Sequence, residues 1–247
     1  MRIGIAGASG RVGTRLVEVI LSSPGLELAA ALVSPGSKLV GTAVAGGSIE
    51  YRPADAGMHS HCDVMIDFTT PAASLALQRE IGDKRIPMVI GTTGFTKEEE
   101  AILTNACAHR PMLVSANFAH GFEAFRLAVI DFAKRMPDAA AKLGETYHAR
   151  KKAEPSGTSR LLAGAIQEAR SQAMGFDAPQ PPIDVQRLGD TVGLHEVHFD
   201  MGSAEASFSY RVHRLGAYAE GAIAAAIWLV SEARPAGRYS LADSLDD

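Results

Sequence analysis

The sequence has few cysteines and no long hydrophobic run. Its two cysteines, Cys62 and Cys107, lie far apart and lack the spacing of a metal site, which excludes a disulfide framework. No stretch approaches the roughly 18 to 20 apolar residues that a membrane span requires, and the N-terminus lacks the apolar core of a signal peptide. We therefore expect a soluble cytoplasmic protein with no membrane partner.

The sequence also lacks an excess of basic residues. It has 24 Lys plus Arg against 28 Asp plus Glu, and the formal net charge of −4 argues against general nucleic-acid binding. An anionic ligand must then be held by a local cluster of residues. His59, His61 and Cys62 are close in sequence, but no further ligand follows at useful spacing, so we expect no metal site.

The first half of the chain alternates short apolar runs with helical patterns. Strands are predicted at residues 2–6, 28–33, 64–66, 88–90 and 112–114. Helical spacing begins at Val12 and recurs over residues 72–81 and 97–108. Strands that alternate with helices predict a mainly parallel, doubly wound sheet.

The second half has a different pattern, in which its last three predicted strands follow one another with no helices between them. Helices are predicted at residues 122–136, 157–172 and 218–231, and strands at 142–148, 185–188, 195–199 and 205–212. Alternating polar and apolar residues in the last strand indicate an antiparallel, half-exposed position. We therefore expect an α/β doubly wound domain, residues 1–118 with 217–247, and a smaller α+β domain, residues 119–216.

A glycine-rich turn follows the first predicted strand directly. Gly7, Gly10 and Gly13 stand where the backbone must turn sharply and approach a pyrophosphate, and Arg11 and Val12 open the next helix. A helix N-terminus offers N–H groups to such an anion. An ordinary βα turn is the alternative, but the strand–turn–helix context favours a Rossmann dinucleotide site.

The end of the second strand bears on which dinucleotide binds. An acid there would bond the ribose 2′-hydroxyl, whereas this chain has Ser34, Ser37 and Lys38. These residues suit a 2′-phosphate, so we expect NADPH to be preferred, with NADH possible. Lys38 could instead be a solvated loop charge.

Three further loops fall at the expected carboxyl edge of the sheet, where open α/β sheets bind ligands. We predict that they contact the ribose and nicotinamide. Their candidate residues are Phe68, Thr69, Gly91, Thr93, Ala116, Asn117 and Phe118.

Residues 145–158 combine a basic run with the start of a helix. Pro155 ends the strand region, and the segment Ser156, Gly157 and Thr158 opens the helix with free N–H groups near Lys151. Such groups suit a small anionic substrate bearing a carboxylate. The alternative is a capped helix behind a solvated basic strand.

At this segment the chain resembles the dihydrodipicolinate reductase family, whose pattern is approximately E-x-H-H-x-x-K-x-x-x-P-S-G-T. Glu145, His148, Lys151 and residues 155–158 match it, and the likeness extends over almost the whole chain. The resemblance implies a Rossmann domain, a substrate and tetramerisation domain and a homotetramer. It also implies NAD(P)H-dependent reduction of a small cyclic unsaturated dicarboxylate, as in lysine and diaminopimelate biosynthesis.

The chain departs from the family at the position of its general acid, where Tyr147 replaces the first histidine of the pair. Tyrosine ordinarily titrates near pH 10 and histidine near pH 6.5, so Tyr147 is the weaker acid unless its surroundings lower its pKa. The catalytic candidates are Tyr147, His148 and Lys151, and either of the first two could give the proton. The candidates for substrate binding are Thr93, His148, Lys151, Ser156, Gly157 and Thr158.

Three hypotheses about function remain. The chain is the lysine-pathway reductase, a paralogous reductase of another cyclic imine or unsaturated acid, or a catalytically silent NADP(H)-binding sensor. Retention of Lys151 and of residues 156–158 speaks against the silent protein, since a sensor need not keep them. Tyr147 leaves the identity of the substrate open.

Overall fold

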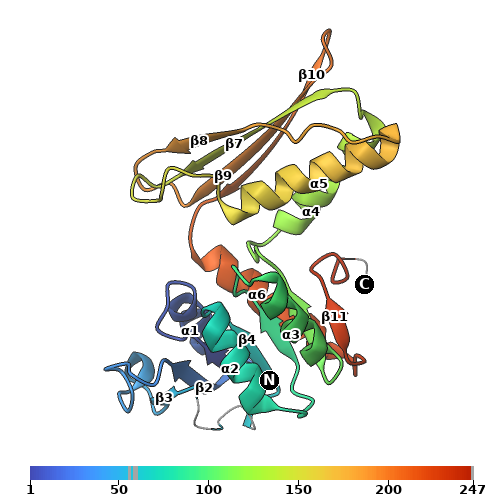
Figure 1. Ribbon diagram of the computed structural model, residues 1–247. Helices are drawn as coiled ribbons and strands as arrows, with labels where there is room; N and C mark the ends of the chain where they lie inside the picture. Colours follow the sequence, from blue (N-terminus) through green and yellow to red (C-terminus); the bar gives the residue numbers. More distant parts are fainter. Residues whose placement is uncertain (55–56, 58–60, 246–247) are drawn as a thin grey trace. The chain divides into compact units, whose positions relative to one another are not determined.

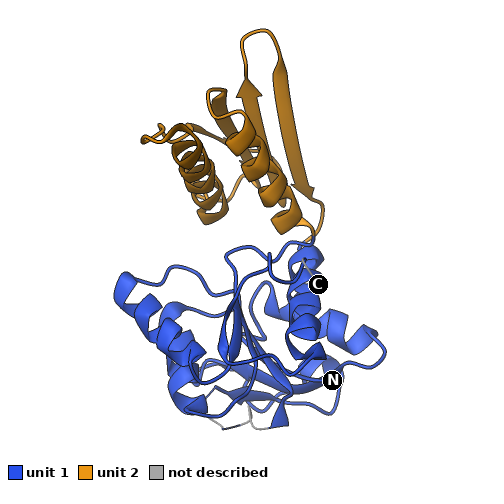
Figure 2. Ribbon diagram, turned by 90° about the vertical axis from the view of Figure 1, so that its right-hand side faces the viewer, with its two compact units in different colours: residues 1–120, 215–247 blue, residues 121–214 orange. Residues whose placement is uncertain are grey.

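The computed structural model describes residues 1–54, 57 and 61–245 (Figure 1). By its internal contacts the chain divides into two compact units (Figure 2). Unit 1 contains Met1–His120 and Leu215–Asp247, and unit 2 contains Gly121–Arg214. The boundaries predicted from the sequence lie after residue 118 and before residue 217. Unit 2 is thus an insertion in the sequence of unit 1.

Unit 1 is built on a parallel sheet of seven strands in the order β11-β6-β5-β4-β1-β2-β3. Its central strands are buried on both faces, which explains their continuous apolar sequences. The strands are β1 Arg2–Ala6, β2 Glu27–Val33, β3 Tyr51–Pro53, β4 Val64–Asp67, β5 Met88–Ile90, β6 Pro111–Val114 and β11 Gly237–Tyr239.

Helices cover both faces of this sheet. Helices α1 (Gly13–Ser22) and α6 (Gly216–Ser231) share one apolar core with the sheet, and α2 (Pro71–Ile81) and α3 (Lys97–Cys107) share the other. A short 3-10 helix, η1 (Val44–Gly46), lies between β2 and β3. The predicted α/β doubly wound fold is confirmed.

Helix α6 returns the end of the chain to unit 1. It packs against α1, and its alanine-rich sequence allows the close approach. Gly221 lies against the backbone of Phe118, where a side-chain methyl group would overlap the carbonyl oxygen. After α6, β11 pairs with β6 at the edge of the sheet.

Unit 2 is a four-stranded sheet with two helices on one face. The strands β7 (Ala140–Tyr147), β8 (Ile183–Arg187), β9 (Gly193–Asp200) and β10 (Glu205–Val212) lie in the order β10-β9-β7-β8. Strands β7 and β8 are parallel and the other pairs are antiparallel. Helices α4 (Phe122–Arg135) and α5 (Gly157–Met174) share an apolar core with the sheet. The predicted smaller α+β domain is confirmed.

The structure differs from the sequence prediction at the edges of the sheets. The strand predicted at 142–148 ends at Tyr147, so His148 lies in the following loop. Strands β3 and β11 were not predicted, because each has three residues and an exposed central arginine. Within the described ranges, no helix is long and apolar enough to cross a membrane.

Candidate active site

The glycine turn after β1 has a geometry that only glycine allows at two positions. Gly7 has a φ of +81°, and a side chain there would overlap the carbonyl of Phe68. A side chain at Gly13 would overlap the carbonyl oxygen of Gly7, which accepts a hydrogen bond from Gly10 N–H at 2.8 Å. Helix α1 begins here with no side-chain cap from the described residues. The turn therefore fits a bound pyrophosphate.

A cavity of about 640 Å³ opens beside this turn, within the usual size range of small-molecule sites. The predicted residues that line it are Gly7, Gly10, Ser34, Phe68 and Thr69. Arg79 and Glu80 of α2 also line it and were not predicted. Nothing in the local sequence of α2 marks these two side chains, because only the fold brings the helix beside β1 and β2.

The structure does not bring the other predicted cofactor residues into this cavity. Phe118 is buried, and its ring meets the ring of Phe68 edge-on, with 5.6 Å between centroids. Gly91 packs against the Phe68 ring so closely that a side chain would overlap it. The remaining predicted residues lie around the turn and the loops: Arg11, Val12, Lys38, Thr93, Ala116 and Asn117.

A buried carboxyl group joins the ends of β4 and β5. Asp67 Oδ1 accepts hydrogen bonds from Thr69 N–H at 3.1 Å, Thr69 Oγ1 at 2.6 Å and Thr92 Oγ1 at 3.0 Å. Burial raises the pKa of Asp67, and these hydrogen bonds offset part of the increase. The hydroxyl that orders this edge belongs to Thr92, whereas Thr93, the predicted residue, is exposed. The sequence alone does not distinguish the two neighbours.

In unit 2, strand alternation gathers three polar residues on the helix-covered face of the sheet. Glu145 and Tyr147 are two apart on β7, so they point to the same side, and His195 of β9 lies directly opposite Glu145 in the ladder. Their exposed fractions are 1%, 6% and 2%. Polar groups buried so deeply require partners.

Glu145 has partners on both carboxylate oxygens. Oε2 accepts a hydrogen bond from Ser156 N–H at 2.9 Å and another from the Ser159 hydroxyl, and Oε1 lies 2.9 Å from Arg187 Nη2. Burial alone would raise the pKa of Glu145, but the bonds from Ser156, Ser159 and Arg187 outweigh it and hold the pKa below its ordinary value. Glu145 is therefore ionised at neutral pH.

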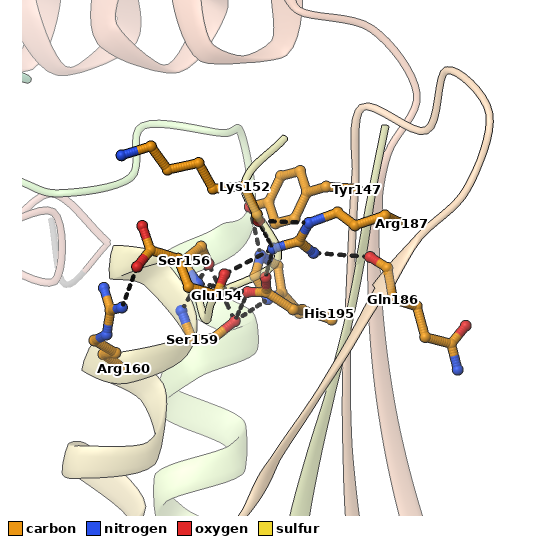
Figure 3. Close-up of polar contacts among 10 residues, drawn as sticks. Tyr147, Lys152, Glu154, Ser156, Ser159, Arg160, Gln186, Arg187 and His195 are labelled. Atoms are coloured by element: carbon orange, nitrogen blue, oxygen red, sulfur yellow. Dashed lines mark hydrogen bonds and ion pairs between the residues drawn. The ribbon is translucent and has the colours of Figure 1, made fainter. Parts of the chain in front are cut away.

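Arg187 of β8 donates hydrogen bonds to the loop after β7 and so holds this loop against the sheet. Its Nη2 donates to the carbonyls of Lys152 and Glu154, both at 2.7 Å, and its Nε donates to Lys152 at 2.9 Å (Figure 3). Because the same guanidinium binds Glu145, the loop that carries Lys151 is held against a buried ion pair.

Tyr147 lies between a histidine and a lysine. Its hydroxyl is 3.0 Å from His195 Nε2, and Lys151 Nζ lies 3.7 Å from the centroid of its ring. Burial raises the pKa of Tyr147, although the hydroxyls of Ser156 and Thr158 offset part of this increase. Burial also lowers the pKa of His195 to about 4. The sequence pattern did not point to His195, because its hydrogen-bonding partners, Tyr147 and Ser159, lie on two other elements, β7 and α5.

The remaining predicted substrate residues surround the start of α5. The Ser156 amide donates a hydrogen bond to Glu145, and the Ser156 hydroxyl caps α5. Gly157 begins the helix, and the first amides of a helix have no intrahelical acceptor. His148 is half-buried, and its Nδ1 has no partner in the described part of the chain.

No group of three or more potential metal ligands is present in the ranges that the structure covers. His59, one of the three residues considered as a metal cluster, lies outside the described residues.

A doubly wound sheet with a glycine turn, joined to a unit bearing a cationic loop at a helix N-terminus, defines the class of nicotinamide-dinucleotide oxidoreductases. Comparison with known families agrees with this class. The model described as "Dihydrodipicolinate reductase, N-terminus" matches residues 1–118, and the corresponding C-terminal model matches residues 121–245. The chain belongs to the dihydrodipicolinate reductase family, whose members are NAD(P)H-dependent oxidoreductases.

Relatives of similar length support the assignment. A 4-hydroxy-tetrahydrodipicolinate reductase of Methanocorpusculum labreanum is 32% identical, over 99% of both chains. One of Acinetobacter baumannii is 34% identical, over 99% of this chain and 96% of that protein. The solved dihydrodipicolinate reductase of Paenisporosarcina sp. TG-14, with dipicolinate bound, has the same fold, with a TM-score of 0.74 and 19% identity over 97% of each chain. The predicted family and enzyme class are confirmed.

Proposed function

We propose that this chain reduces 4-hydroxy-tetrahydrodipicolinate with NADPH, in the cytoplasm, as a step of lysine and diaminopimelate biosynthesis. The observation that carries the proposal is the position of Lys151 above the buried Tyr147 ring, in the loop that leads to the N-terminus of α5. Its relatives bear the name of this reductase, and a neighbour of the same fold was solved with dipicolinate, a cyclic dicarboxylate. Unit 1 binds the cofactor and unit 2 the substrate.

Lys151 and the first amides of α5 bind the substrate carboxylates in this proposal. Gly157 and Thr158 supply N–H groups at the positive end of an 18-residue helix, and Lys151 supplies a full charge. Arg187 and Glu145 do not contact the substrate but hold the loop in place. Lys151 also neutralises negative charge that develops as the substrate is reduced.

Two neighbouring side chains are candidates for the proton donor. The bound dinucleotide supplies the hydride from its nicotinamide ring. Tyr147 is buried and bonded to His195, and its pKa is raised by burial, all of which oppose release of its proton. His148 is half-buried in the loop after β7, and its Nδ1 has no partner in the described part of the chain. These contacts favour His148.

The preference for NADPH rests on the loop after β2. Ser34 lines the cavity beside the glycine turn and Lys38 is exposed nearby in sequence, while no acid follows Val33 to bind a ribose 2′-hydroxyl. NADH remains a usable second cofactor in this proposal.

A homotetramer formed through unit 2 completes the proposal. The alternate residues Ser207, Ser209 and Arg211 of β10 are exposed, which leaves the outer face of its sheet open to a partner copy. Sedimentation equilibrium should give four times the chain mass. A monomer would contradict this part of the proposal alone.

The central experiment follows loss of NADPH absorbance with freshly generated substrate, beside NADH and a no-substrate control. Turnover by the wild-type protein is expected, and Lys151→Ala should lower kcat/KM at least about a hundredfold. Arg150→Ala is the matched control, since this neighbouring cation is 83% exposed and should change kcat/KM less than about twofold. Absence of wild-type turnover, or near-normal turnover by Lys151→Ala, would contradict the proposal.

A further inference from the structure

Four buried side chains in unit 2 form a continuous hydrogen-bonded chain. The Tyr147 hydroxyl lies 3.0 Å from His195 Nε2, and His195 Nδ1 lies 3.3 Å from Ser159 Oγ. The Ser159 hydroxyl in turn donates to Glu145 Oε2. This series of hydrogen bonds begins at Tyr147, one of the two predicted proton donors, and ends at the Glu145 carboxylate, which is paired with Arg187.

The charge on Glu145 determines which group donates in each of these hydrogen bonds. Its carboxylate is ionised, so it has no proton to give and can only accept from the Ser159 hydroxyl. The Ser159 hydroxyl has only one proton, and it donates this proton in the hydrogen bond to Glu145. Toward His195 the same oxygen can only accept, so His195 must carry a proton on Nδ1.

The second nitrogen of His195 is then fixed as well. Burial lowers the pKa of His195 to about 4, so the ring is neutral near pH 7 and carries only one N–H. With that proton on Nδ1, Nε2 presents a lone pair to the Tyr147 hydroxyl 3.0 Å away. A contact of this length is favourable only if the phenol donates its proton to Nε2.

We propose that His195 is a positioning residue that keeps the phenol proton of Tyr147 inside the protein, so that Tyr147 orients its neighbours and His148 is the proton source. The proposal rests on the reduction proposed above. The phenol oxygen then serves as an acceptor toward the Thr158 hydroxyl at the start of α5, and the Lys151 ammonium lies over the ring.

The alternative, in which Tyr147 is the proton source, is unfavourable. If Tyr147 gave its proton to the substrate, a phenolate would face the lone pair of Nε2 inside a buried site. Relieving that repulsion requires a proton on Nε2. His195 could take one only as a buried cation or by breaking the bond to Ser159 that orders the chain.

The first test needs no substrate and therefore stands apart from the proposed function. Long-range ¹H–¹⁵N spectra of ¹⁵N-histidine-labelled protein at neutral pH report which ring nitrogen carries the proton, and His195→Gln assigns the signal among the eight histidines. We expect His195 to be protonated on Nδ1 only. Ser159→Ala should shift part of the population to the Nε2–H form. An Nε2–H or doubly protonated ring in the wild-type protein would overturn the proposal.

The second test uses turnover. Tyr147→Phe should lower kcat about tenfold or less, because it removes hydrogen bonds between the phenol and neighbouring side chains and not the proton source. His148→Gln should lower kcat by about 10²- to 10⁴-fold, as loss of a general acid does. His195→Gln should lower kcat in the wild-type protein but add little to Tyr147→Phe, since it acts through Tyr147; a purely structural role would give equal effects in both backgrounds. A loss of 10²-fold or more in Tyr147→Phe, with His148→Gln near normal, would overturn the proposal.

Discussion

Gly221 of α6 lies so close to Phe118 that a methyl group on its Cα would overlap the Phe118 carbonyl oxygen. The contact joins the last helix to the loop after β6, and the obstacle is backbone that cannot rotate away. The space at residue 221 is therefore a requirement of the packing of unit 1.

We predict from this contact that Gly221→Ala lowers the free energy of unfolding by about 3 kcal/mol, although alanine is the better helix former. Urea denaturation followed by circular dichroism measures it. Gly164→Ala in α5 is the control, because nothing lies within 4 Å of its added methyl group. It should stabilise the protein by about 0.5 to 1 kcal/mol. Equal effects of the two substitutions would refute the packing argument.

Glu145→Gln should destabilise the protein by roughly 3 kcal/mol, because it leaves the Arg187 guanidinium, whose side chain is only 11% exposed, without its counter-charge. Asp184→Asn on β8 is the comparison. Its ion pair with Lys142 is 2.6 Å long, but both side chains are more than half exposed, so its loss should cost less than about 1 kcal/mol. Both values come from urea denaturation at pH 7. A smaller loss in Glu145→Gln than in Asp184→Asn would contradict the prediction.

Stability should fall as the pH is lowered toward 4. The pKa of His195 is about 4 in the folded protein against 6.5 for an ordinary histidine, so the unfolded chain binds more protons between these values. The free energy of unfolding should therefore decrease from about pH 6.5 to about pH 4, by roughly 3 kcal/mol from this residue. Glu145, whose pKa is lowered, adds a further loss at more acidic pH.

Denaturation at a series of pH values measures this loss, and His195→Gln supplies the control. The variant lacks the ionisable ring, so its stability should depend less steeply on pH between 6.5 and 4. Identical pH dependence in the two proteins would show that His195 is not buried in the neutral form.

If Lys38 binds the 2′-phosphate as proposed, Lys38→Ala should lower kcat/KM for NADPH about tenfold, because it removes one cation from that phosphate, while kcat/KM for NADH should not change. Steady-state kinetics with both cofactors measures the ratio, and NADH serves as the internal control. Parallel losses with the two cofactors would assign Lys38 a structural role instead.

The sequence predicted the central elements of both units because their patterns are local. Strand β10 has the predicted bounds, since polar and apolar residues alternate along its whole length. Strand β3 could not be predicted in this way, because three residues that include Pro53 carry no periodic signal. Its position depends on pairing with β2.

The residues of the candidate site also differ in whether a local sequence pattern marks them. Gly7, Lys151 and Gly157 belong to short motifs and were named from the sequence. His195 was not among the candidates, because a histidine on an alternating strand shows nothing of its surroundings. Its significance comes from the β7–β9 register, which places it opposite Glu145, and from Ser159 on a helix that packs over both. Such a constellation is tertiary, and a single sequence does not reveal it.

The insertion of unit 2 into unit 1 sets an order of events during synthesis on the ribosome. Residues 121–214 form one uninterrupted stretch and can complete their sheet and helices as soon as they emerge. The first 120 residues cannot, because their apolar core lacks Ala222, Ala226 and Leu229 of α6 until the end of translation. The apolar core that unit 1 shares with α6 can therefore be completed only after the whole of unit 2 has been made.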